Sequence, residues 1–232
     1  MELLTSWGVE FDPVNIEGNP AGLAELRALG VPGAPAVALP DGRVVHGWNP
    51  PGYAALVGVE YREPVKFSPA ELAGRLDRIL SFTSRLMLAL PPEALAHKPA
   101  KRDRDLLNLG FHVFRLALGF ADGMDLGEFH HAWLQEKAPP DFKDGAAVAR
   151  YGALVRGRLG GWFEGAADSE YARIINVYYG PQSGHDLLER TTWHAAQHFR
   201  QIHVVATELG VAVPDPLPVA DFEGLPMPAS LW

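Results

Sequence analysis

The chain contains no cysteine among its 232 residues. Without thiols it has no disulfide, no zinc–thiolate site, no cysteine nucleophile and no thiol redox cycle of its own. The reactive chemistry that remains is that of carboxylates, hydroxyls and imidazoles, and nine histidines are present. Histidine is therefore the first residue type to examine for a site.

An excess of positive charge is also missing. The 28 acidic residues outnumber the 20 basic ones and give a formal net charge of −8, which argues against an extended surface for nucleic acid or anionic membranes. No uncharged apolar run approaches the ~18 residues of a membrane helix, and the first residues lack the pattern of a signal peptide. We expect a cytoplasmic protein whose partner is a small molecule, with no nucleic acid and no membrane.

Hydrophobic residues, at 47% of the chain, are numerous enough for a packed core. Residues 1–60 have the pattern of a small α/β domain. A strand is predicted over Val9–Ile16, although Pro13 makes it an edge or an irregular strand. The other predicted elements are a helix over Pro20–Leu29 and a hairpin whose strands, Ala36–Leu39 and Arg43–His46, are joined by Asp41-Gly42.

The rest of the chain is predicted to be mainly helical. Residues 61–67 have the composition of a linker, and Ser68-Pro69 then gives an N-cap followed by proline at the first helical position. Four helices are predicted, over 68–90, 103–120, 145–163 and 183–209. Their length and their long connections favour a four-helix bundle. The proline-rich tail, residues 211–232, cannot form a regular helix and is expected to dock on the bundle.

Two histidines share one face of the last predicted helix. His194 and His198 are spaced i, i+4, so their rings lie one turn apart, on a seam that is otherwise mainly apolar. His112 lies on the apolar stripe of the second predicted helix. If the two helices are neighbours, the three imidazoles form an open coordination set for a divalent metal. The alternative is a group of hydrogen-bonded core histidines without a metal.

Nearby residues are candidates for supporting this site. Asn108 lies one turn before His112, and Arg115 lies one turn after it. Gln201 lies one turn beyond His198. The side-chain amide of Asn108 or of Gln201 can accept the second N–H of a ligand histidine and fix its tautomer. For Arg115, a solvated position at the helix edge is the competing interpretation.

Two stretches of sequence carry a family resemblance. The segment LPPEALAHKPAKRDRDLLNLGFHVFRLA (Leu90–Ala117) and the segment WHAAQHFRQI (Trp193–Ile202) resemble the DinB-like superfamily of metal-binding four-helix proteins. The resemblance covers roughly residues 68–210. It implies that His112, His194 and His198 bind a divalent metal, with zinc or nickel the first candidates.

Residues 1–58 resemble the glutaredoxin branch of the thioredoxin fold. The resemblance implies that the Ala34–Pro35 peptide bond is cis and that Ala34 and Pro35 occupy the place where the family binds a low-molecular-weight thiol. The chain lacks the CxxC motif and the first strand of that fold. A degenerate, purely structural domain is the alternative, and the missing strand leaves a homodimer open.

Together these features predict an α+β protein. An incomplete glutaredoxin-like α/β domain (1–60) is followed by a linker (61–67), a DinB-like four-helix bundle (68–210) and a docked tail (211–232). The expected function is that of a metal-dependent enzyme, either a transferase that acts with a low-molecular-weight thiol or a hydrolase that uses metal-bound water. A non-catalytic metal- or thiol-binding protein, or an assembly protein with a structural or sensory site, is the alternative.

Overall fold

The structure is a computed structural model that describes residues 3–4, 7–14, 16, 19–61, 66–100, 104–227 and 231. It divides into two compact units. The first comprises residues 1–66 with 178–181, and the second comprises residues 67–177 with 182–232. Most of the predicted linker (62–65) and the tail residue Trp232 lie outside the described residues.

The first unit contains two short helices and a hairpin, α2 (Pro20–Ala28), α3 (Pro50–Val57), β1 (Ala36–Ala38) and β2 (Val44–His46). The strands pair antiparallel, with Val37 opposite Val45. Each helix begins with proline after an asparagine cap, whose side chain accepts a hydrogen bond from a backbone N–H of the first turn.

The structure differs from the sequence prediction at Val9–Ile16. The described residues of this range, 9–14 and 16, form no strand. Pro13 has no N–H to donate, and no neighbouring strand supplies a partner within the described residues, so the backbone follows an irregular path. The Ala34–Pro35 bond is cis, as predicted. The sheet formed by β1 and β2 has only these two strands within the described residues. The glutaredoxin-like fold of this unit therefore stays a prediction.

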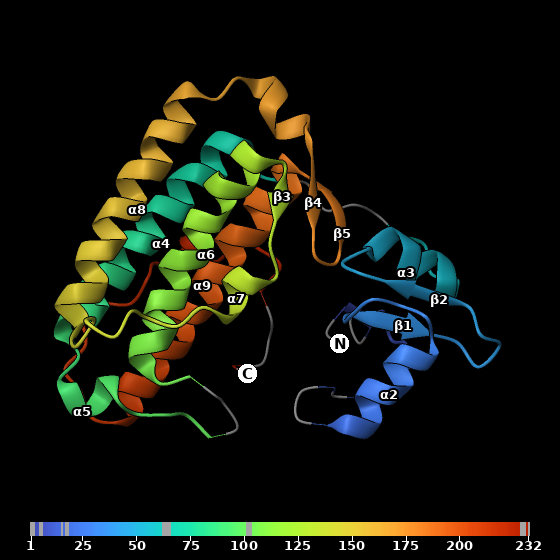
Figure 1. Ribbon diagram of the computed structural model, residues 1–232, viewed down its shortest axis with the longest axis horizontal. Coiled ribbons are helices and arrows are strands. Elements are labelled where there is room, and N and C mark those ends of the chain that lie inside the picture. Colours follow the sequence, from blue (N-terminus) through green and yellow to red (C-terminus); the bar gives the residue numbers. More distant parts are fainter. Residues whose placement is uncertain are drawn as a thin grey trace. The chain divides into compact units, whose positions relative to one another are not determined.

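The second unit is built around four long helices (Figure 1), which are α4 (Pro69–Ala89), α6 (Leu106–Leu126), α8 (Gly145–Gly165) and α9 (Gly184–Glu208). Helix α4 packs on α8 and α9, and α6 packs on the same two helices. The predicted four-helix bundle is therefore present, and the second and fourth helices are neighbours. That adjacency is what a site shared between them requires.

Shorter elements connect the bundle helices or follow the last of them. They are α5 (Pro92–Leu95), β3 (Glu128–Phe129), α7 (Ala132–Gln135), the 3-10 helices at Asp168–Ala172 and Val219–Asp221, β4 (Ile174–Val177) and β5 (Gly180–Ser183). The order of the small sheet is β3-β4-β5, and β3 runs parallel to β4. No helix in the described parts of the chain combines the length and the apolar character needed to cross a bilayer.

Helix α6 ends six residues beyond the prediction, which places its end at Phe120 before Asp122-Gly123, and it begins three residues later than predicted. Gly123 lies within the helix, where a Cβ atom would contact the side chain of Phe129 at 3.6 Å. The helix ends instead at Gly127, whose φ of 76° is the left-handed conformation of a helix C-cap. The left-handed conformation at Gly127, and not the glycine at 123, therefore marks the end of the helix.

The start of α4 is held by a capping box. The Ser68 side chain accepts from the Glu71 N–H at 3.3 Å, and the Glu71 carboxylate accepts from the Ser68 N–H at 2.8 Å. Ser68→Ala should lower the free energy of unfolding by about 1 kcal/mol, because it leaves a helix N–H without its acceptor. Urea denaturation measures this change. The exposed Ser169→Ala is the control, and an equal loss in both variants would contradict the assignment.

The tail contacts the second unit through its described residues. Leu217 and Leu225 are buried. Asp221 is also buried and accepts two hydrogen bonds from the guanidinium of Arg78 on α4, at 2.8 and 2.7 Å. A buried carboxylate with a charged partner avoids most of the cost of desolvation, so this pair positions the tail along α4.

Candidate metal centre

The three predicted histidines converge between α6 and α9. The ring centroid of His112 lies 5.4 Å from that of His194 and 5.1 Å from that of His198. The two α9 rings are 4.3 Å apart. One nitrogen from each ring lies within 4.8 Å of the other two, which is the geometry of a group able to hold one metal ion.

The hydrogen bonds around His198 define which nitrogen faces the cluster. Its Nε2 lies 3.1 Å from Nε2 of His194, and its Nδ1 lies 2.6 Å from Oε1 of Gln201. An amide oxygen only accepts, so Nδ1 of His198 carries the proton. The Nε2 of His198 then presents a lone pair toward His194, as a metal ligand must.

His112 carries a polar atom that lacks a protein partner. Its Nδ1 is buried and has no hydrogen-bond partner within the described residues. A buried polar atom left unsatisfied costs about 1–3 kcal/mol, so a group of this kind needs an explanation. An imidazole set that accepts a cation provides one, because the lone pairs of neutral histidines are the ligands that divalent transition metals take.

Burial keeps the imidazoles of His112 and His194 neutral. Burial, with smaller contributions from the neighbouring His198 and from the guanidinium groups of Arg104 and Arg190, lowers the pKa of His112 to about 2. Burial also holds the pKa of His194 well below its ordinary value, with the same charged neighbours contributing. Neutral imidazole is the form that binds a metal, so the site keeps the two rings ready to ligate at neutral pH.

Of the three predicted supporting residues, Gln201 lies at the cluster. Asn108 instead accepts from the backbone N–H of Ala138 at 2.9 Å and donates to the Asp105 carboxylate at 2.9 Å. None of the hydrogen bonds found for Asn108 in the described residues goes to a histidine. Its side chain fastens the connection after α7 to the first turn of α6.

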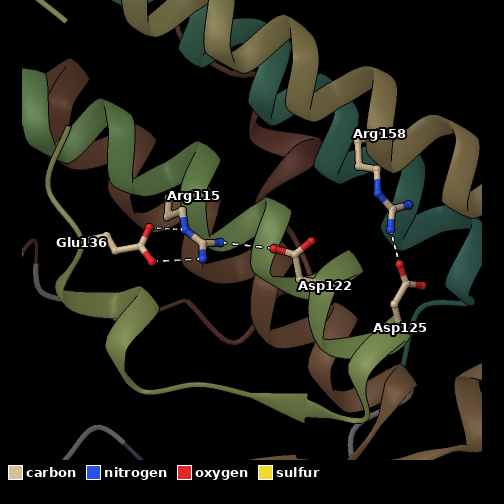
Figure 2. Close-up of polar contacts among 5 residues, drawn as sticks. All are labelled: Arg115, Asp122, Asp125, Glu136 and Arg158. Atoms are coloured by element: carbon tan, nitrogen blue, oxygen red, sulfur yellow. Dashed lines mark hydrogen bonds and ion pairs between the residues drawn. The ribbon is translucent and has the colours of Figure 1, made fainter. Parts of the chain in front are cut away.

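Arg115 also holds the segment that follows α7 against α6. Figure 2 shows its guanidinium between Glu136, which follows α7, and Asp122 on α6. The guanidinium also lies over the Trp133 ring, 4.9 Å from its centroid. Arg115 is 8% exposed, so it is not the solvated edge residue that was the competing interpretation. Its contacts in the described residues bind α7 to α6 rather than support a ligand histidine.

Figure 2 also shows an ion pair between α6 and α8 that does not involve the histidine cluster. Asp125 pairs with Arg158 and also accepts from the indole N–H of Trp162 at 3.2 Å. These contacts are partly exposed, and exposed ion pairs contribute about 0–1 kcal/mol. They support the bundle and add no group to the cluster.

Gln197 and the backbone carbonyl of Leu231 also belong to the surroundings of the cluster, and neither was predicted. Gln197 and Gln201 both donate to the backbone carbonyl of Leu231, at 2.8 and 2.6 Å. Both glutamine side chains are buried. The signal for them was available in the sequence, because two glutamines at i, i+4 interleave with the i, i+4 histidine pair on one helix.

No protein-family model matches the chain, and no curated protein matches it. Solved structures do share its bundle. A DinB-like protein from Bacillus subtilis matches with a TM-score of 0.51 and 18% identity, over 62% of this chain and 96% of that one. YfiT from Bacillus subtilis, described as a probable metal-dependent hydrolase with an unusual four-helix bundle topology, matches with a TM-score of 0.50 and 13% identity. It covers 66% of this chain and 96% of its own.

Proposed function

We propose that the chain is a metal-dependent hydrolase of the DinB-like fold, with a divalent transition metal held by His112, His194 and His198. The main support is the convergence of one nitrogen from each of these rings to within 4.8 Å. The solved structures that share the bundle are DinB-like proteins, and the description of YfiT as a probable metal-dependent hydrolase favours the same chemistry.

These three histidines would hold a divalent metal, which would supply a Lewis acid for a substrate oxygen or for activating a water molecule. The chain's own residues prepare this chemistry. Gln201 keeps the proton of His198 on Nδ1, away from the cluster. Burial of His112 and His194 keeps both rings neutral, so each keeps one nitrogen with a free lone pair.

Two positively charged side chains near the cluster indicate the charge of the substrate that we expect. Arg104 and Arg190 lie near enough to His112 and His194 to lower the pKa values of both rings. Arg190 stands one turn before His194 on α9, and Arg104 precedes α6, so the two come from different segments of the chain. A small molecule with an anionic group is therefore the substrate class that we expect to bind best.

Hydrolysis can be tested with the purified chain after chelator treatment. A panel of chromogenic carboxylic esters and phosphate esters is assayed with and without zinc, nickel, cobalt or manganese. The proposal expects turnover that requires metal and falls at least 100-fold in His194→Ala, because one of three ligands is lost. His203→Ala, on the same helix but outside the cluster, should keep the activity.

Two other outcomes would redirect the assignment. If cobalt binds, no ester is hydrolysed and a small thiol changes the visible spectrum of the cobalt-loaded protein, the site serves thiol transfer instead. The thiol-binding role expected for Ala34 and Pro35 would then be the next to test. If metal binds without hydrolysis and without a thiol response, a structural or sensory site is favoured.

A further inference from the structure

One backbone carbonyl near the carboxyl end of the chain is held by two buried amides. The Leu231 oxygen accepts from Nε2 of Gln197 at 2.8 Å and from Nε2 of Gln201 at 2.6 Å. The two glutamines are 6% and 2% exposed. Buried amides with such defined partners have little freedom to rotate, so the carbonyl and the amides fix one another.

The orientation of the Gln201 amide matters for His198. A carbonyl oxygen can only accept, so the NH₂ end of Gln201 must face Leu231 and its Oε1 must face Nδ1 of His198, 2.6 Å away. If the amide turned over, its NH₂ would face Nδ1, and the proton of His198 would move to Nε2. That proton would then point at Nε2 of His194, and Nε2 of His198 would have no lone pair to offer a metal.

We propose that the backbone carbonyl of Leu231 is a positioning group of the metal centre, acting through Gln201 on the tautomer of His198. The inference rests on the proposed metal site. In this arrangement Gln201 contacts His198, the Leu231 carbonyl orients Gln201, and Gln197 holds the carbonyl in place. The loss of a hydrogen-bonding partner behind a metal ligand typically costs 10–100-fold in metal affinity.

A double-mutant cycle in the full chain tests this relay. Gln197→Leu removes one donor to the Leu231 carbonyl. This substitution is introduced both into the natural chain and into the Gln201→Glu variant. A carboxylate at 201 accepts from Nδ1 of His198 through either oxygen and needs no orienting partner. Zinc affinity, measured by competition with a chromophoric chelator, should fall about tenfold in Gln197→Leu. In the Gln201→Glu background the same substitution should leave the affinity unchanged.

The control is Gln135→Leu, which removes an exposed amide outside the cluster. Equal weakening by Gln197→Leu in both backgrounds would assign a general structural role to Gln197 and overturn the relay. No weakening in either background would overturn it as well.

The tautomer of His198 gives a second measurement that does not need a metal. Nitrogen-15 NMR of the metal-free chain should show the proton on Nδ1, and Gln197→Leu should shift part of the population to the other tautomer. An unchanged tautomer in Gln197→Leu overturns the relay. If the natural chain binds no zinc but the tautomer responds as expected, the metal assignment fails while the relay holds.

Discussion

Adding zinc, nickel or cobalt to the metal-free chain should raise its melting temperature by roughly 5–10 °C. At a free metal concentration about 100-fold above the dissociation constant, binding to the folded state alone contributes about 2.7 kcal/mol. A domain of 150–250 residues gains about 2–4 °C for each kcal/mol. Differential scanning calorimetry with and without chelator measures the shift.

The His198→Ala variant should lose this stabilisation. It removes the ring whose Nε2 lies 3.1 Å from Nε2 of His194, and it leaves His112 and His194 as an incomplete pair. His203→Ala is the matched control, because it removes an imidazole from the same helix outside the cluster. If His198→Ala kept the full shift, the ligand assignment would be wrong. If no metal shifted the natural chain, the core-histidine interpretation would hold.

The local part of the site could be predicted from the sequence. The i, i+4 spacing of His194 and His198 places both rings on one face of any α-helix, whatever surrounds it. Gln201 follows from the same periodicity. The position of His112 required more, because it depends on which helices are neighbours. Four long helices allow several arrangements, and the one observed places α6 against α9.

The parts of the site that depend on irregular segments could not be predicted. Arg115 contacts Glu136 because residues 127–144 fold back along α6, and no periodic pattern records the path of such a connection. Leu231 contributes a backbone carbonyl, which any residue supplies, so its identity carries no signal. The sequence prediction also places the end of α6 too early, because a helix continues through Gly123 and the left-handed cap forms at Gly127 instead.

The metal-free chain should lose stability steeply in mild acid. Burial lowers the pKa of His112 in the folded state to about 2, whereas an unfolded histidine has its ordinary pKa near 6.5. Between these values the unfolded chain binds a proton that the folded chain excludes. The stabilising contribution is therefore complete above pH ~6.5 and declines as the pH falls toward 2.

The slope follows from the difference in bound protons. One proton corresponds to roughly 1.4 kcal/mol per pH unit, and an unfolded histidine is half protonated at pH 6.5, so His112 alone should remove about 2 kcal/mol between pH 6.5 and 4.5. The pKa of His194 is shifted in the same direction and makes the slope steeper. Urea denaturation of the chelated protein at several pH values measures this dependence, and a flat profile over that interval would contradict the buried neutral state.

A matched pair of variants distinguishes the contribution of the histidine cluster to the pH dependence of stability from that of the carboxylates, which also titrate in acid. His112→Leu removes the imidazole and fills its place with apolar atoms, so the slope between pH 6.5 and 4.5 should decrease by roughly 1.4 kcal/mol per pH unit. His203→Leu controls for the loss of a histidine elsewhere in the bundle. Metal affinity of the natural chain should fall over the same interval, because protons and metal compete for the same lone pairs. An acid-sensitive slope that persisted in His112→Leu would place its origin outside the three-histidine cluster.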